Sequence, residues 1–255
     1  MKKIKQIRFY LISSLIITGM FLMAGPAWSM ETVDHSLFDA LLKQHVLPDG
    51  NVDYQGFQKD EARLDSYLTV LEQAAPDTLS RNEKFAFYIN TYNAWTIKLI
   101  LSGYPGVESI KDLGGFFSSP WKKKIVRING KVMTLDDIEH AILRPEFKDP
   151  RVHFAINCAS KSCPVLRPEA YTGSRLDSQL DDATGNFLHD PQHNYLKGND
   201  LYVSSIFKWF GEDFQNDIVG FFIRHAREKL RSDLIGKKQS IKVRYLDYDW
   251  SLNGK

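Results

Sequence analysis

The stretch from Ser80 to Gly103 constrains the fold more than any other part of this 255-residue sequence. Ser80 and Glu83 have the spacing of a capping box, in which the two residues satisfy free backbone donors of the first helical turn. Gly103 and Pro105 are typical of the end of a helix. One side of the predicted helix is mostly apolar and aromatic, with Phe85, Tyr88, Ile89, Tyr92, Trp95, Thr96 and Leu99. We therefore expect the most buried helix of the chain here.

The remaining patterns mix helices with short strands. Apolar residues recur at helical spacing over 36–46, 58–75, 135–143, 175–189, 206–210 and 216–230. Hairpin turns are predicted at Asn129-Gly130 and around 197–200, and alternation predicts a strand over 151–157 and a closing strand over 241–245. Strands and helices do not alternate regularly. The sequence therefore predicts the α+β class, as a single domain of mixed helices with a small, mainly antiparallel sheet.

The first 29 residues have the pattern of a cleavable export signal. Four basic residues precede an apolar run over 9–23, and Ala27 and Ser29 place small residues where a signal peptidase needs them. The alternative is a retained membrane anchor, but the run is shorter than the roughly 20 residues of a spanning helix. We expect a signal peptide over 1–29, one domain over 30–255, and a periplasmic or extracellular protein with no stable membrane span after cleavage.

Charge and cysteine content narrow the classes of partner. Removing the leader takes four basic residues and no acidic one, so the formal net charge changes from +2 to −2. A nearly neutral chain lacks the basic surplus that nucleic-acid binding requires. Only two cysteines occur, too few for a disulfide-based scaffold. We expect no nucleic-acid partner, and a small-molecule or peptide ligand instead.

The segment from His153 to Pro164 gathers reactive side chains between a predicted strand and a loop, a common setting for functional groups. One interpretation is a structural Cys158–Cys163 disulfide. A second is a thiol nucleophile, Cys163 or Cys158, with His153 as its base. A third is a metal site that adds His189 or His193. None of the familiar zinc spacings is present, so we expect neither metal nor cofactor.

Asparagines supply further candidate groups. Asn90 and Asn93 share one face of the predicted buried helix. Asn90 could complete a Cys-His-Asn arrangement, and Asn157 could lie near a developing oxyanion. The alternative is that these amides bond buried backbone groups in an ordinary polar network.

Three motifs together resemble a known family. They are the run from Asn90 to Asn93, the run from His153 to Pro164, and Ser205 to Phe210 followed by Asp213-Phe214. The chain resembles the uncharacterised family called domain of unknown function 547, and its ending over 248–253 fits exported bacterial members. A papain-like or transglutaminase-like relationship would suit a Cys-His domain. Because His153 precedes both cysteines, that relationship would require a permuted arrangement.

These residues support competing functions. The leading hypothesis is an exported hydrolase or acyltransferase that uses a Cys thiolate on an amide or thioester, with His153 as general base. The main alternative is a non-catalytic binding domain stapled by the disulfide, with the aromatic loop Phe116 to Trp121 as its contact surface. A third use is a cycling dithiol, although the spacing differs from C-x-x-C. An oxidising compartment favours the bonded cysteines, so thiol chemistry requires a sulfur that stays free.

Overall fold

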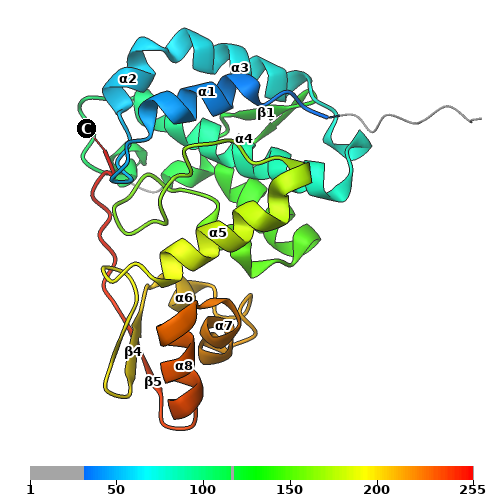
Figure 1. Ribbon diagram of the computed structural model, residues 1–255. Helices are drawn as coiled ribbons and strands as arrows, with labels where there is room; N and C mark the ends of the chain where they lie inside the picture. Colours follow the sequence, from blue (N-terminus) through cyan, green and yellow to red (C-terminus); the bar gives the residue numbers. More distant parts are fainter. Residues whose placement is uncertain (1–31, 116–117, 255) are drawn as a thin grey trace, which may run out of the picture.

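The structure, a computed structural model, describes residues 32–115 and 118–254 (Figure 1). The predicted signal peptide over 1–29 lies outside the described residues, as do Phe116 and Phe117 of the predicted contact loop. The first part is helical: α1 (Ser36–His45), α2 (Tyr54–Lys59), α3 (Glu61–Gln73), the 3-10 turn η1 (Pro76–Thr78) and α4 (Arg81–Leu101). Two further 3-10 turns follow, η2 (Ile110–Leu113) and η3 (Pro120–Lys122).

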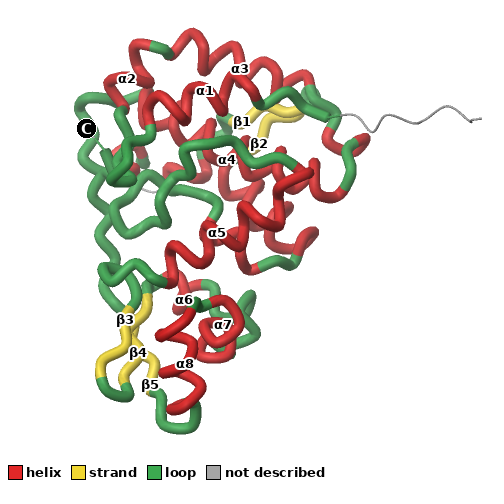
Figure 2. The backbone as a smooth tube through the Cα atoms, viewed as in Figure 1, coloured by secondary structure: helices red, strands yellow, loops and turns green. Residues whose placement is uncertain are grey.

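The chain continues with short strands and irregular helices. A hairpin of β1 (Val126–Ile128) and β2 (Lys131–Met133) precedes the π-helix η4 (Asp137–Phe147) and the 3-10 helix η5 (Pro150–Phe154). Residues 155–172 form the loop that holds both cysteines, called the two-Cys loop below. After it come η6 (Gly173–Arg175) and α5 (Leu176–Leu188). The C-terminal part holds β3 (Tyr195–Lys197), β4 (Asp200–Val203), α6 (Ile206–Trp209), α7 (Ile218–His225), α8 (Glu228–Lys237) and β5 (Lys242–Tyr245). Helices predominate above and a small sheet lies below (Figure 2), so the α+β prediction is confirmed.

The predicted central helix is confirmed as α4. The Ser80 hydroxyl accepts a hydrogen bond from the Glu83 backbone N–H at 3.3 Å, which satisfies a free donor of the first turn. From Phe85 to Leu101 every residue except Lys98 is buried. The helix contacts α2, α3, the π-helix and η6, so other elements cover it on several sides. The side-chain amides of the buried Asn90 and Asn93 therefore bond backbone groups of the protein rather than water.

Both predicted hairpins are confirmed. Val126 pairs with Met133 across the first turn, and Asn129 and Gly130 have φ angles of 47° and 72° there. Positive φ at both positions defines a type I′ turn, whose twist matches that of the strands. In the second sheet β3 pairs antiparallel with β4, and β4 pairs parallel with β5. The parallel pair follows from the crossover through α6, α7 and α8.

The predicted strand over 151–157 is wrong. Residues 150–154 form the 3-10 helix η5, which Asp149 caps by accepting a hydrogen bond from the Arg151 N–H at 3.0 Å. Pro150 occupies the first helical position, where its missing N–H costs nothing. His153 and Ala155 are buried along with Val152 and Phe154. The apolar alternation therefore did not reflect one face of a sheet.

Two predicted helices are divided. The helix over 58–75 breaks at Asp60, whose carboxylate lies 2.8 Å from His45 Nε2 and so ties the break to α1. The helix over 216–230 breaks at Ala226 and Arg227, which are extended. This break lets α8 fold back against α7.

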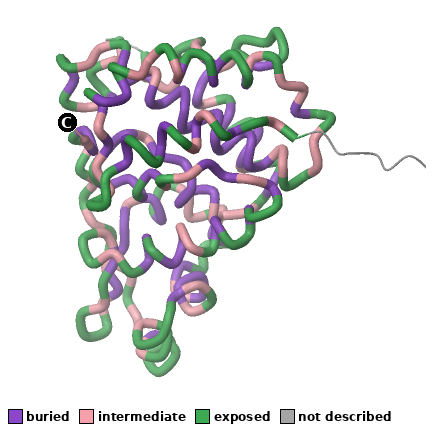
Figure 3. Tube along the Cα trace, turned by 45° about the horizontal axis from the view of Figure 1, so that its top comes forward, coloured by how far each residue is buried: buried purple, intermediate pink, exposed green. Residues whose placement is uncertain are grey.

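Buried hydrophobic side chains form two cores. The buried residues, purple in Figure 3, lie along segments in both the upper and the lower part of the molecule. The larger core surrounds α4, and the smaller one collects aromatic residues of α5, α6 and α7 with β4. The last residues, 246–254, return from β5 along the molecule to α2 (Figure 1). There the Tyr54 hydroxyl donates to Asn253 Oδ1 at 2.8 Å. Over the described ranges, no helix is long and apolar enough to cross a membrane.

Candidate functional site

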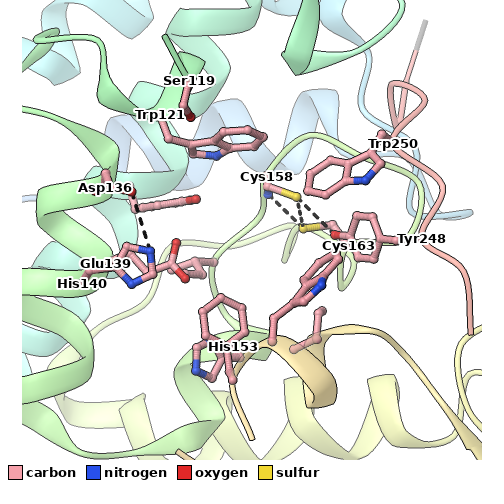
Figure 4. A pocket seen from close by; sticks show the side chains of 15 residues that line it. Ser119, Trp121, Asp136, Glu139, His140, His153, Cys158, Cys163, Tyr248 and Trp250 are labelled. Atoms are coloured by element: carbon pink, nitrogen blue, oxygen red, sulfur yellow. Dashed lines mark hydrogen bonds and ion pairs between the residues drawn. The ribbon is translucent and has the colours of Figure 1, made fainter. Parts of the chain in front are cut away.

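A pocket of about 210 Å³ opens between elements of the two cores. The π-helix, the two-Cys loop, α6 and the C-terminal segment all contribute side chains to it. Figure 4 shows Asp136, Glu139 and His140 along one wall and the two cysteines with Tyr248 along the opposite wall. Three indoles, of Trp121, Trp209 and Trp250, complete much of the lining. The pocket thus combines an apolar surface with titratable groups.

The two cysteines are in contact but not bonded. Their sulfur atoms lie 2.9 Å apart, in close contact but well beyond the length of a disulfide bond, about 2.05 Å. The Cys158 backbone N–H also donates to Cys163 Sγ at 2.9 Å. Cys163 is buried, and Cys158 is half-buried at the pocket. The predicted disulfide is therefore not present in this structure.

Hydrogen bonds and burial shift the pKa values of the two thiols in opposite directions. The Cys163 thiol, the Ser160 hydroxyl at 3.1 Å and the Tyr248 hydroxyl at 3.3 Å all approach Cys158 Sγ. The hydrogen bond from Cys163 and those from Ser160 and Tyr248 lower the pKa of Cys158 to about 6 against the effect of burial. Burial and the neighbouring Cys158 charge raise the pKa of Cys163. Of the two sulfurs, Cys158 is therefore the one that ionises more readily.

Glu139 gives the pocket a carboxyl group that holds its proton near neutrality. Burial raises its pKa to about 7, and the negative charge of Cys158 adds to this effect. Arg144 and a hydrogen bond with Tyr92 oppose the shift without cancelling it. Glu139 is the third residue of the π-helix, which begins at Asp137. The pocket therefore places a protonated acid opposite a thiolate.

His153 is held by Asp213 rather than by either cysteine. Its Nε2 lies 2.7 Å from Asp213 Oδ2, and its ring stacks on Phe210 at 4.1 Å between centroids. Arg144 binds both oxygens of the same carboxylate, at 2.6 and 3.1 Å. Burial lowers the pKa of His153, so the ring is neutral and donates from Nε2. No hydrogen bond joins it to a sulfur atom within the described residues, and Nδ1 keeps the lone pair.

The predicted asparagines hold the backbone instead of lining the pocket. Asn90 bonds both backbone groups of Tyr171, at 2.8 and 2.9 Å. Asn93 bonds the Ala155 carbonyl and the Asn157 N–H in the same manner, at 2.9 and 2.8 Å. Asn157 donates to the Pro164 carbonyl at 2.7 Å and accepts from the Ala159 N–H at 2.8 Å. These amides fix the ends and the turn of the two-Cys loop.

The histidines of the metal interpretation lie apart from the cysteines. His189 Nδ1 bonds the Gly185 carbonyl at 2.7 Å, and His193 Nδ1 bonds Asp190 at 2.7 Å. Neither histidine lines the pocket. Among residues 32–115 and 118–254, no group of three or more His, Cys, Asp or Glu side chains is arranged to hold a metal ion.

Several pocket groups were missed from the sequence. Tyr248, and Asp213 beside the pocket, appeared only within the segments that carry the resemblance, with nothing to place them in space. Glu139 and His140 lay on a helix predicted for its apolar spacing alone. The motif that contains Trp209 and Asp213 was the available sequence signal for these groups, because the resemblance includes it together with the two-Cys motif. Linking the two motifs in space would have suggested the Asp213–His153 pair.

Comparison of the chain with models of known protein families supports the resemblance. Residues 76–188 match the model of the family described as protein of unknown function, DUF547. That segment contains both cysteines, His153, Asn90, Asn157 and Glu139, whereas Trp209, Asp213, Tyr248 and Trp250 lie outside it. No curated protein and no solved structure matches the chain.

Proposed function

We propose that this chain, which resembles the DUF547 family over residues 76–188, is an exported thiol-dependent hydrolase or acyltransferase acting on an amide or thioester. Cys158 is the nucleophile. The observation that carries the proposal is the cluster of Cys163, Ser160 and Tyr248 within hydrogen-bond distance of Cys158 Sγ, at the wall of a pocket that also holds Glu139. Donors that stabilise a thiolate activate a cysteine for attack.

The steps use groups already in the pocket. The Cys158 thiolate attacks the carbonyl carbon of the substrate, and Glu139 gives its proton to the leaving nitrogen or sulfur. An acyl thioester on Cys158 results. Water or an acceptor then attacks this thioester while His153 removes its proton as general base. The proton passes on to the Glu139 carboxylate, and Cys158 leaves as a thiolate. Both groups return to their starting protonation states.

His153 keeps the role of general base, but toward the incoming water and not toward Cys158. The Asp213 carboxylate accepts a hydrogen bond from Nε2–H and so orients the ring, which leaves Nδ1 as the basic nitrogen that faces the water. This assignment replaces Asn90 and Asn157 by Asp213 as the orienting group. Asn90 and Asn157 act on the shape of the two-Cys loop.

An acyl-trapping experiment tests the proposal. Reduced protein is incubated with a neutral activated ester and a small thioester, and the adduct is located by peptide mass spectrometry. We expect one acyl group on Cys158 and turnover that Cys158→Ala abolishes.

The control variant is Lys161→Ala, because the chain has no third cysteine that could report nonspecific thiol reactivity. The Lys161 side chain is exposed on the same loop and the variant keeps the backbone hydrogen bond of this residue, so acylation of Cys158 should persist. Acylation at another residue, or turnover that survives Cys158→Ala, would refute the proposal.

Export is part of the same proposal. The chain expressed with its leader in a bacterial host should be recovered from the cell envelope or medium with Met30 as its first residue. Recovery of an uncleaved chain in the membrane fraction would instead favour the retained anchor.

The binding-domain alternative has one observation in its favour. Trp209, Tyr248 and Trp250 pack against one another with centroids 4.5 to 5.6 Å apart and present a continuous aromatic wall to the pocket. Such a wall suits a flat apolar ligand. If a ligand binds the reduced protein and Cys158→Ala equally and neither is ever acylated, the binding function is the correct one.

A further inference from the structure

The two cysteines of the two-Cys loop are held in contact with each other, and they differ in their exposure to the pocket. Cys158 reaches the pocket, whereas Cys163 is buried behind it, only 7% exposed, with its sulfur 2.9 Å from Cys158 Sγ. Closing this gap to a bond requires a movement of about 0.9 Å. An accessible attacking sulfur with a buried partner in contact is the arrangement that thiol–disulfide exchange needs.

The backbone of the loop is fixed in this contact geometry. The Cys163 N–H donates to the Ser160 carbonyl at 3.0 Å, which closes the turn between the two cysteines. The Lys161 N–H donates to the Ser251 carbonyl at 2.9 Å, and the Asp249 N–H donates to the Ser162 hydroxyl at 2.8 Å. The C-terminal segment therefore holds the loop from outside. The sulfurs meet without a rearrangement of the chain.

We propose that Cys158 and Cys163 carry out thiol–disulfide exchange with a disulfide substrate, Cys158 as the attacking sulfur and Cys163 as the resolving sulfur. This activity uses the same thiolate as the proposed acyl transfer but does not depend on that reaction. It differs from a structural staple because the pair cycles between dithiol and disulfide.

The exchange balances in two steps. The Cys158 thiolate attacks one sulfur of the substrate disulfide, which forms a mixed disulfide and releases the other sulfur as a thiolate. Cys163 loses its proton to this released thiolate and attacks Cys158 Sγ. The second substrate sulfur leaves, and the Cys158–Cys163 bond forms. The substrate is reduced by two electrons and the protein is oxidised by two; an external dithiol restores the protein.

The pocket wall indicates the class of disulfide. Tyr248 and Trp250 line the side of the pocket near the sulfurs, and Asp136 and Glu139 lie across it (Figure 4). Trp209, which also lines the pocket, packs on both aromatic rings. Aromatic surface favours a disulfide with an apolar or aromatic substituent. Carboxyl groups and a thiolate disfavour an anionic substituent. The expected substrate is therefore a neutral or cationic disulfide beside an apolar group.

A titration with 4,4′-dithiodipyridine, a neutral aromatic disulfide, tests the proposal. Each attack on a sulfur releases thiopyridone, which is measured by its absorbance. The reduced wild-type protein should release two equivalents and end with an internal disulfide and no pyridyl group, as judged by intact mass. Cys163→Ser should release one equivalent and retain a stable pyridyl adduct on Cys158. Cys158→Ser should react much more slowly, since Cys163 is buried.

Two outcomes would overturn the proposal. One is a wild-type protein that ends with pyridyl adducts and no internal bond. The other is an oxidised wild-type protein that an added dithiol does not reduce under native conditions, because a staple behaves in this way. Both are read on the wild-type chain, so they hold even if a variant fails to fold.

The ester and thioester assays on the reduced wild-type protein distinguish this proposal from acyl transfer. A protein that exchanges disulfides and forms no acyl adduct supports the exchange alone. The reverse result leaves only the acyl reaction.

Discussion

Charge in the pocket is set by individual side chains whose proton affinities depend on one another. The pKa of Cys158 is about 6 because donors surround its sulfur, and the pKa of Glu139 is about 7 because it is buried near that sulfur. Between these values the pocket holds a thiolate and a protonated acid together. This is the state that acyl transfer requires.

The rate of acyl transfer should therefore follow a bell-shaped pH profile. It rises through the Cys158 pKa of about 6 as the thiol ionises and falls above the Glu139 pKa of about 7 as the acid loses its proton. Glu139→Gln cannot titrate, so its profile should be slower overall and lack the falling limb. Steady-state rates across pH with a thioester substrate measure this. A falling limb that persists in Glu139→Gln would assign it to another group.

His35, which does not line the pocket, makes stability depend on pH. Burial lowers its pKa to about 4, although Asp34 acts in the opposite sense, and its Nδ1 bonds the Tyr67 hydroxyl at 2.7 Å. Below about pH 6.5 His35 binds a proton in the unfolded chain, whereas in the folded chain it stays neutral until the pH approaches 4. Stability contributed by neutral His35 is therefore complete above that pH and is lost as the pH falls toward 4.

Substitution of His35 isolates this effect. His35→Gln keeps an acceptor for Tyr67 but does not titrate. Between about pH 7.5 and 5 the wild type should lose about 2 kcal/mol more unfolding free energy than the variant. Urea unfolding at the two pH values measures the difference. Equal losses in both proteins would show that His35 is not the responsible group.

At the scale of elements, the π-helix shapes the acidic wall of the pocket. Thr134 and Asp137 cap its start reciprocally, with two hydrogen bonds of 2.9 Å. Arg144, near its end, bonds His140 at 2.9 Å and reaches Asp213 after α6. Wide helical turns of this kind are frequent at functional sites. Arg144 thus ties the wall of the pocket to the segment that orients His153.

Loss of Arg144 should loosen this connection. Arg144→Gln removes the charged partner of the half-buried Asp213 carboxylate, so we expect a loss of about 2 kcal/mol in unfolding free energy. Denaturant titration measures it. The control is Lys229→Gln on α8, whose ion pair with Asp233 is exposed and should contribute less than about 0.5 kcal/mol. Equal losses for the two variants would contradict a structural role for Arg144.

Some elements were predictable from local sequence, and others were not. Ser80 and Asn129-Gly130 act through their own backbone neighbours, so the start of α4 and the first hairpin were predicted correctly. The 3-10 helix at 150–154 was misread because its apolar residues are buried from all sides by distant segments. Asp149-Pro150 was the local signal against a strand. The tie between the π-helix and Asp213 joins distant parts of the chain, so no local pattern reveals it.

At the scale of the whole molecule, the C-terminal segment joins the two cores and completes the pocket. It brings Tyr248 to Cys158 and Trp250 to Trp209, then ends at Asn253 among residues of the larger core. The cysteines, His153 and their loop were predictable as one candidate site. Their partners Glu139, Asp213 and Tyr248 were not, because each approaches from a different part of the chain.

The anchor of this segment is open to a direct test. Asn253→Ala leaves the buried Tyr54 hydroxyl without its acceptor and removes a 3.2 Å bond to Asn157. We expect a loss of about 1–3 kcal/mol in unfolding free energy, together with faster alkylation of Cys163 as the segment loosens. Asn186→Ala, at an exposed position of α5, is the control and should change neither quantity. An unaltered Asn253→Ala protein would mean that the segment is held by other contacts.

Both proposed reactions depend on Cys158 being a thiolate at neutral pH while Cys163 remains a thiol. The most direct measurement is the rate of iodoacetamide alkylation of the reduced, folded protein from about pH 4 to 9, with each cysteine followed by peptide mass spectrometry. We expect that Cys158 alone reacts and that its rate rises with a midpoint at its pKa of about 6. A midpoint near the ordinary cysteine value of about 8.5, or preferential alkylation of Cys163, would contradict it.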